Sequence, residues 1–396
     1  MKLFRGCWTG AVLYLIVGGG FIPVAAQGAP KSSADVMSCS DCTHYPVVAA
    51  ELGRGNTNAP VFSLFSRVSR DSRGRIFVGP VNNFSGVAVF SAAGNFEKLL
   101  GGVGEGPGEF RSVTISGVLP GDSVWVFDSR IRRLSIFGPD LRFARSVPFM
   151  QHQALVFAPS GVITGLGDIR SENRIGKFIH QYAAATGNYL RSLGPEKAVS
   201  PGTNAQIPFV SLMSDRNGQL WSAGVAPVRF VSYGETGAAS REVMVQPPWL
   251  PFPALKPRTK PGRPATAETP ATAAVPLEPI PTVNSVTIAA NGDFWILGAL
   301  PSADWRTKKN PFEPLPAESK GVKRRSDPSD QIELYNGWYN TIVESVNFDP
   351  SGRARTVVRA KIRTGLAQML SDGLVAGMAA DSDGVVSITV WKLQSK

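Results

Sequence analysis

The sequence predicts an all-β fold, a six-bladed β-propeller closed by an N-terminal strand that completes the last blade. Short apolar segments separated by tight turns recur along the chain, and one turn-and-strand pattern occurs six times. No helical period persists after Ala26. A small sheet cannot bury both of its faces alone, so repeated units of this kind must stack beside one another.

The clearest unit spans residues 62–101. Asp71-Ser-Arg-Gly74 is a tight-turn signal inside it. Four short apolar segments of the unit are typical of antiparallel strands. These segments are Phe62–Val68, Arg75–Val78, Val87–Phe90 and Asn95–Leu100.

The turn that leads into the second strand of this unit recurs along the chain. Asp381-Ser-Asp-Gly384 even repeats the pattern of Asp71–Gly74. The six copies of the turn and strand begin at Gly74, Asp122, Gly161, Gly218, Gly292 and Gly384. The blades expected from them are 62–101, 112–148, 153–194, 208–246, 283–362, and 373–393 together with 43–52.

The sixth unit runs out of chain soon after Trp391-Lys-Leu393, and Thr43–Gly53 is a spare strand. A ring of sheets closes when the first strand completes the last sheet, because this removes the open edge. We therefore expect residues 43–52 to pair with 384–393. No second spare strand is evident, so a last blade of only three strands is one expectation.

The first 26 residues are typical of a signal peptide. A basic start with Lys2 and Arg5 precedes a short apolar run, and Val24-Ala25-Ala26 supplies small residues before a cleavage point. A retained membrane anchor is the alternative, but Gly18-Gly-Gly20 interrupts the run. The expected organisation is a signal peptide over 1–26, a disordered tail over 27–38 and the propeller over 39–396. The expected product is a periplasmic or secreted monomer with no transmembrane segment after signal removal.

Cys39 and Cys42 are the cysteines that remain after loss of the signal, and they predict a disulfide in an oxidising compartment. A redox CxxC is the alternative, but that motif belongs in a βαβ setting. Covalent haem attachment needs His directly after the second Cys, and Thr43 stands there. A structural zinc would need a second pair of ligands, and none is evident.

The chain is basic. Without Lys2 and Arg5, 39 Lys and Arg residues face 30 acidic ones, a net charge of +9. Basic exported proteins can meet acidic polysaccharides or anionic lipid surfaces. Nucleic acid is not an expected partner after export, and much of the excess charge lies in expected loops such as Lys256–Arg263.

The connections of the expected blades differ in length on the two faces of the disc. The turns from strand one to two and from three to four are tight, whereas the insertions 247–282 and 299–336 fall on the opposite face. Insertions on one face of a repeat fold often mark its binding side. The candidate binding residues are Asn82, Asn83, Glu109, Arg130, Arg132, His152, Asp168, Asn284 and Trp305.

The run Gly101–Phe110, GGVGEGPGEF, invites comparison with phosphate-binding loops. Such loops lead into a helix N-terminus, whereas here Pro107 interrupts the run and a strand follows. The sequence predicts a tight inter-blade connection whose glycines take positive φ. Phe110 is expected to pack between blades.

GEGPGEF at Gly104–Phe110, DSRGRIFV at Asp71–Val78 and the six units together resemble the exported six-bladed β-propeller proteins of bacteria, which are similar to NHL-repeat propellers. The resemblance implies the fold and says little about activity. Six-bladed propellers also include lactonase-like hydrolases that hold a divalent ion on the axis, and this gives an alternative function.

An axial metal site needs carboxylates and amides where the innermost strands begin. Glu109 and Asn284 are the nearest candidates, and neither a second carboxylate nor a nucleophile–base pair is evident. We therefore expect no catalytic residue, metal or cofactor, and a scaffold that binds an envelope protein or glycan. The expected innermost strands begin near Ser63, Ser112, Gln153, Phe209, Asn284 and Leu374, none of which is acidic.

Overall fold

The structure is a computed structural model in which Met37–Lys396 form one compact unit. The predicted signal peptide, the predicted tail and most of the two predicted insertions lie outside the described residues. The residues described are 39–52, 60–81, 85–150, 152, 154–158, 160–167, 178–193, 211–215, 217–225, 228–234, 237–250, 281–289, 292–307, 339–348, 354–364, 366–370, 372–380 and 386–396.

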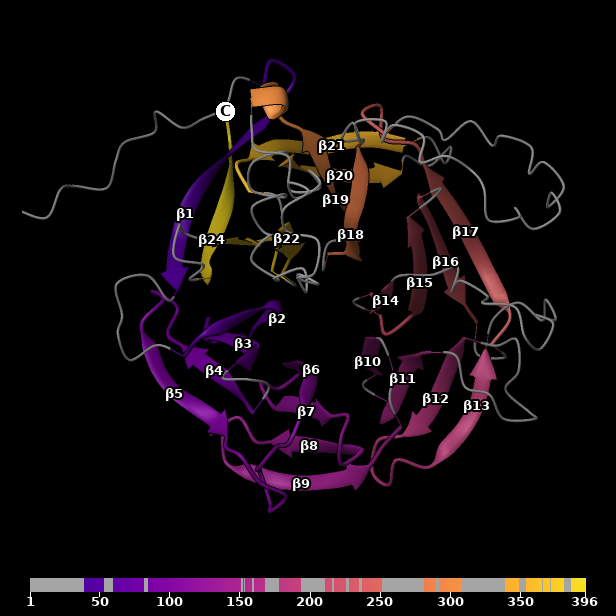
Figure 1. The fold of residues 1–396 in the computed structure, drawn as a ribbon. Helices are drawn as coiled ribbons and strands as arrows, with labels where there is room; N and C mark the ends of the chain where they lie inside the picture. The colour runs from indigo at the N-terminus through magenta and orange to yellow at the C-terminus, as the bar shows by residue number, and fades with distance from the viewer. Residues whose placement is uncertain are drawn as a thin grey trace, which may run out of the picture. The chain divides into compact units, whose positions relative to one another are not determined.

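Six four-stranded antiparallel sheets form the blades of a β-propeller, as the sequence predicts (Figure 1). Blade one contains β2 (Phe62–Arg70), β3 (Ile76–Val81), β4 (Gly86–Phe90) and β5 (Phe96–Gly101). Blade two contains β6 (Val113–Val118), β7 (Val124–Asp128), β8 (Arg133–Phe137) and β9 (Phe143–Pro148). Blade three contains β10 (Ala154–Ala158), β11 (Val162–Leu166), β12 (Ile179–Ala183) and β13 (Tyr189–Leu193).

The remaining blades follow the same order from the innermost to the outermost strand. Blade four contains β14 (Ser211–Ser214), β15 (Leu220–Val225), β16 (Val228–Tyr233) and β17 (Ala239–Val245). Blade five contains β18 (Thr282–Ile288), β19 (Phe294–Pro301), β20 (Tyr339–Phe348) and β21 (Ala354–Ile362). Blade six contains β22 (Leu366–Met369), β23 (Val375–Ala380), β24 (Val386–Ser395) and, outermost, β1 (His44–Leu52).

The ring closes through β1, as expected. This strand pairs antiparallel with β24, from His44 opposite Ser395 to Leu52 opposite Ile388. Without β1, β24 would be an open edge, which favours edge-to-edge association. The predicted closure is therefore confirmed.

The expectation of a three-stranded last blade was wrong. The short strand β22 is its innermost strand, and the tight turn that leads into the second strand contains Gly373, not Gly384. Gly384 instead lies between β23 and β24, outside the described residues. Leu374 therefore does not begin the innermost strand as expected. The four residues Leu366–Met369, which precede the turn, form that strand instead.

Each interface between neighbouring blades has its own hydrophobic core. Blades one and two share a cluster in which Phe77 and Val89 meet Val124 and Phe137. Blades five and six share another, in which Leu297 and Val343 join Val375. Burial of this kind contributes about 25 cal/mol per Å² of apolar surface, so each blade depends on its neighbours for stability.

The turn from strand one to strand two has the same backbone hydrogen bond in all six blades. In blade one the N–H of Gly74 donates to the carbonyl of Asp71, and Gly74 has φ +85°. In blade two Asp122 takes the place of the glycine at φ +65°, a region that Asp tolerates better than most residues. The donors are Gly74, Asp122, Gly161, Gly218, Gly292 and Gly373.

The glycine-rich run forms the tight connection between blades one and two that its sequence predicts. Phe110 is fully buried, its N–H donates to the Gly102 carbonyl, and a Cβ on Gly101 would lie 2.5 Å from its ring. Only Gly101 and Gly108 of this run have positive φ, so the expectation was too broad for the other glycines.

A single turn of 3-10 helix, η1 (Trp305–Thr307), follows β19. Within the described part of the chain, no helix is long and apolar enough to cross a membrane.

Candidate functional site

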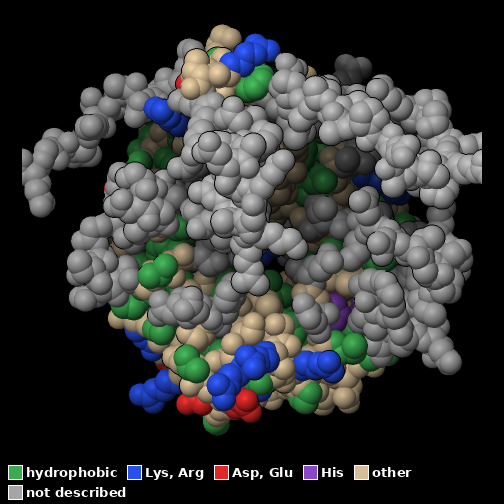
Figure 2. All heavy atoms as spheres, in the orientation of Figure 1, with side chains coloured by type: hydrophobic (Ala, Val, Ile, Leu, Met, Phe, Trp, Pro, Cys, Tyr) green, Lys and Arg blue, Asp and Glu red, His purple; other side chains and the backbone are tan. Residues whose placement is uncertain are grey.

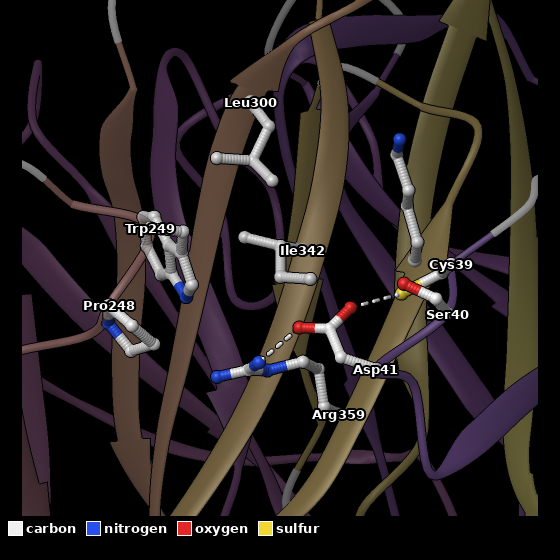
Figure 3. Close-up of a pocket in the computed structure, with 9 residues that line it drawn as sticks. Cys39, Ser40, Asp41, Pro248, Trp249, Leu300, Ile342 and Arg359 are labelled. Carbon is white, nitrogen blue, oxygen red and sulfur yellow. Dashed lines mark hydrogen bonds and ion pairs between the residues drawn. The ribbon is translucent and has the colours of Figure 1, made fainter.

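A pocket of about 380 Å³ opens at blade five, where the outermost strand β21 meets the segment that leads into β1. We call it the rim pocket. In Figure 3, Trp249 lies on one side, Cys39, Ser40 and Asp41 on the other, and Ile342 between them. It is lined by Cys39, Ser40, Asp41, Pro248, Trp249, Leu300, Ile342, Arg359 and Lys361.

The register of blade five gives the pocket its floor. Ile342 lies opposite Lys361, and two residues further along, Glu344 lies opposite Arg359. Side chains at alternate positions of a strand share one face of the sheet. An aliphatic, an acidic and two basic side chains are therefore grouped on one face of β20 and β21.

Trp249 covers this face from the connection between β17 and β18. A Cβ on Gly298 would overlap the Trp249 ring, so glycine at that position lets the indole lie against β19. The indole N–H donates to Glu344 with a nitrogen–oxygen distance of 2.6 Å. The residues that follow blade four are thereby attached to the interior of blade five.

Glu344 is 1% exposed, and its carboxylate is satisfied inside the protein. Besides the indole, the Thr356 hydroxyl donates to it at 2.7 Å and the Arg359 guanidinium at 3.3 Å. A buried carboxylate needs such donors, because an isolated buried charge is very costly. Glu344 is therefore a buried hydrogen-bond acceptor that stabilises the structure beneath the rim pocket.

Arg359 connects this carboxylate to the N-terminal segment. Its guanidinium also pairs with Asp41, and its backbone N–H donates to the Thr43 hydroxyl at 2.9 Å. The hydrogen bond from Arg359 lowers the pKa of Asp41. Burial acts to lower the pKa of Arg359, but the charge of Glu344 and the hydrogen bonds with Asp41 and Glu344 outweigh it, so that pKa is raised.

Cys39 and Cys42 lie at disulfide distance, with their Cα atoms 5.3 Å apart, in agreement with the expected pairing. Together with Asp41 they are the group of metal-ligand residue types found close together in the described part of the chain. A sulfur in a disulfide is not a thiolate and so does not bind a metal in the usual way. The short loop instead forms one wall of the rim pocket.

Arg130 and Arg132 lie where the sequence placed them, in the connection between β7 and β8, and both are exposed. Neither guanidinium makes a hydrogen bond or an ion pair with another residue in the described part of the chain. Figure 2 shows Lys and Arg side chains gathered over the region that β7 to β9 occupy in Figure 1. Arg111, Arg142 and Arg145 of this blade are exposed as well, and Arg111 pairs with Glu105 at 3.3 Å.

The other predicted residues that the structure describes lie in other segments of the chain. Glu109 is exposed, and its carboxylate accepts the Gly106 N–H at 2.9 Å. Asn284 is exposed at a bulge of the innermost strand β18, and Trp305 lies in η1 under the guanidinium of Arg306. The remaining candidates Asn82, Asn83 and Asp168 lie outside the described residues.

His152 is not a surface residue, because its side chain is 5% exposed. Its Nδ1–H donates to the Met150 carbonyl at 2.8 Å, and Nε2 accepts from the Tyr182 hydroxyl at 3.1 Å. His180 is also buried, with Nε2 3.1 Å from the Gly167 carbonyl oxygen. Both imidazole rings are therefore part of the packed interior of blade three.

The six innermost strands contain no Asp or Glu. The charged residues on them are Arg67 and Arg70, and Arg70 pairs with Asp372. Arg67 is accessible to solvent, yet the protein around it desolvates the guanidinium and lowers its pKa. These strands therefore offer arginine side chains and no carboxylate, whereas a divalent metal requires oxygen ligands such as carboxylates.

No protein-family model matches this chain, and no curated protein matches its sequence. Among solved structures, a DUF4221 family member from Bacteroides vulgatus is similar, with a TM-score of 0.52, 10% identity, and coverage of 89% of this chain and 99% of that one. This likeness shows the fold. The chain is a six-bladed β-propeller.

Two further Bacteroides structures are similar with lower TM-scores. A Bacteroides fragilis protein described as exported has a TM-score of 0.47 and 10% identity over 89% of this chain and 96% of its own. A Bacteroides thetaiotaomicron protein of unknown function has a TM-score of 0.45 and 8% identity over 88% of this chain and 76% of its own.

Sequence reasoning found the basic pair of blade two and missed the rim pocket. Arg130 and Arg132 follow a recognisable strand, so their place in a connection is readable from local sequence. The rim pocket joins Asp41, Trp249 and Arg359, which are far apart in the chain. No local pattern marks them, because the register of β20 against β21 decides which side chains meet.

Proposed function

We propose that this protein is an exported binding scaffold that recognises an acidic envelope partner, a protein or a glycan, through the face that carries Arg130 and Arg132. The observation that carries the proposal is this pair of exposed guanidinium groups without partners in the described part of the chain. Charged groups on a surface speed encounter with an oppositely charged partner and select against like-charged ones.

The backbone beneath the pair is held in place before any partner arrives. Asp128 is fully buried, and its carboxylate accepts the N–H of Arg130 at 2.9 Å and that of Arg111 at 2.6 Å. Arg132 has φ +52°, and its carbonyl accepts the Phe149 N–H at 2.8 Å. A preorganised surface loses less conformational entropy on binding, which supports recognition at this face.

The lengths of the connections support the same face. The connections from strand one to two are short in all six blades, and those from three to four are short in blades one to five, whereas residues 246–281 separate β17 from β18 and residues 302–338 separate β19 from β20. In antiparallel blades, the strand ends that flank these long connections lie on the same face as the connection between β7 and β8, which supports the proposal.

The test is a charge reversal. Arg130→Glu with Arg132→Glu should abolish recovery of the partner from envelope extract, and Lys98→Glu with Lys392→Glu, which reverses two exposed charges elsewhere, should not. Protease treatment of the extract removes a protein partner, and periodate treatment removes a glycan. Equal recovery by both double variants would refute the proposed face.

A second variant asks whether the long connection of blade five takes part. Pro301 and Tyr339 lie opposite each other in the ladder, so a short turn can replace residues 303–337 without cutting β19 or β20. Loss of the partner would assign this connection to the binding face, and retention would restrict the face to blade two. A rise in melting temperature with calcium or zinc would instead favour a metal-dependent hydrolase, since a metal bound to the folded state stabilises it.

A further inference from the structure

We propose that the rim pocket binds a monocarboxylate carried on a compact ring, with the Lys361 ammonium as the cation that receives the carboxylate. This site shares no residue with the Arg130 and Arg132 pair. Its test can therefore fail while the proposed scaffold function stands, and the reverse is also true.

The size of the pocket fits a small molecule. A volume of about 380 Å³ lies within the range of roughly 300–1,000 Å³ that ligand pockets in proteins usually have. It is also bounded by well-fixed elements, since β19, β20 and β21 form a continuous ladder on one side. The cysteine loop opposite is attached to the ladder by the pair between Asp41 and Arg359.

The lining combines apolar surface with a few polar groups. Trp249, Leu300 and Ile342 contribute an indole and two aliphatic side chains. The hydrogen-bonding capacity of the indole N–H is already used by Glu344. What Trp249 offers a ligand is therefore ring surface, which suits a flat or ring-shaped body.

Lys361 is the cation of the pocket without a direct partner among the described residues. Its side chain is half-buried, and no hydrogen bond or ion pair joins it to another residue in the described part of the chain. Arg359, by contrast, already has both Asp41 and Glu344 as partners. A partly desolvated ammonium interacts more strongly with an anion than one in open water.

The charge balance favours a monoanion over a dianion. Arg359 and Lys361 together balance Asp41 and Glu344, so these four groups carry no net charge. A phosphate dianion would leave two negative charges at the site, whereas a carboxylate would leave one and can pair with the ammonium in one charge-assisted hydrogen bond. Uronic acids and aromatic acids share this chemistry, a carboxylate next to a six-membered ring.

The experiment measures binding of four probes to the purified protein by calorimetry and saturation-transfer NMR. The probes are glucuronate, benzoate, glucose and inorganic phosphate. We expect at least one of the two acids to bind, and glucose and phosphate to bind at least about tenfold more weakly. Glucuronate alone would identify an acidic sugar, and benzoate alone a hydrophobic acid.

The variants assign the interaction to Lys361. Lys361→Met keeps the length of the side chain without its charge and should weaken acid binding by about tenfold or more. Lys361→Arg should retain binding, and Lys392→Met, at an exposed lysine of β24, is the matched control and should not change it. Thermal unfolding shows whether each variant is folded.

Three results would overturn the proposal. They are acid binding that Lys361→Met leaves intact, glucose binding as tight as that of the acids, and no binding of either acid at millimolar concentration to folded protein. Each concerns the rim pocket alone, so recovery of an envelope partner in the same protein would leave the scaffold function standing.

Discussion

The indole N–H of Trp249 donates a hydrogen bond to the buried carboxylate of Glu344, 95 residues further along the chain. This bond joins the end of blade four to the middle strands of blade five. It also fixes one wall of the rim pocket, since the Trp249 ring lies directly over Gly298. The packing of the Trp249 ring against Gly298 can be tested by mutation.

Gly298→Ala should destabilise the protein because the new methyl group would overlap the Trp249 ring. Overpacking of a buried site costs about 1–3 kcal/mol of unfolding free energy. In a Trp249→Phe background the smaller ring leaves room, so the penalty of Gly298→Ala should shrink. Urea unfolding of the two single variants and the double variant measures this coupling, and strictly additive effects would contradict the arrangement.

Gly101→Ala should lower the free energy of unfolding by about 2–5 kcal/mol. Its φ of +101° strains any L side chain, by about 1–2 kcal/mol. Its Cβ would in addition lie 2.5 Å from the Phe110 ring, and such overpacking adds a further 1–3 kcal/mol or so.

The neighbouring glycine is the control for this substitution. Gly102 does not have positive φ, and a Cβ there would meet nothing within 4 Å. Gly102→Ala should therefore stay within about 0.5 kcal/mol of the parent. Comparable losses in both variants would mean that the loop, rather than the contact with Phe110, is sensitive.

Removing residues 39–52 should convert the monomer expected from the sequence into an associating species. The ladder from His44 to Leu52 covers the edge of β24, and an exposed edge pairs with other chains. Size-exclusion chromatography of the truncated chain should show oligomers. A peptide of residues 39–52 added during refolding should restore the monomer, because strand addition to an open edge needs no covalent link. A scrambled peptide that worked equally well would count against pairing in register.

The free energy of unfolding should fall at acid pH, partly because Asp122 becomes protonated. Its pKa is lowered first by the hydrogen bond from the Ser72 hydroxyl and second by the Ser72 backbone N–H. The folded-state pKa lies below the unfolded value, so this carboxylate contributes fully above about pH 4 and its contribution is lost as pH falls through the folded pKa. Asp41 acts in the same direction through Arg359.

Asp122→Asn tests this contribution, since Asn also tolerates the φ of +65° found there. The variant should be less stable than the parent at neutral pH. Its unfolding free energy should also vary less between about pH 4.5 and 2.5, as measured by urea titrations at each pH. A parallel pH profile would show that Asp122 has an ordinary pKa in the folded state.

Much of the fold was readable from the sequence because its signals are local. The turn at Asp71–Gly74 and its copies set strand ends within a few residues, and positive φ at Gly161 or Gly218 follows from the same pattern. The error in blade six had a local cause as well. Asp381–Gly384 resembles the first turn closely, whereas the true turn at Gly373 follows a strand of only four residues.

The sequence by itself determined most of the strands, the number of blades and the closure by β1. Short apolar segments and turn chemistry act over a few residues, and one spare strand has only one open edge to fill. The tertiary structure alone decided the rim pocket. Asp41 and Arg359 are 318 residues apart, and their contact depends on ring closure, on the register of β20 with β21, and on a glycine that lets Trp249 approach. Those relationships arise when six sheets pack together, so no segment of the chain encodes them separately.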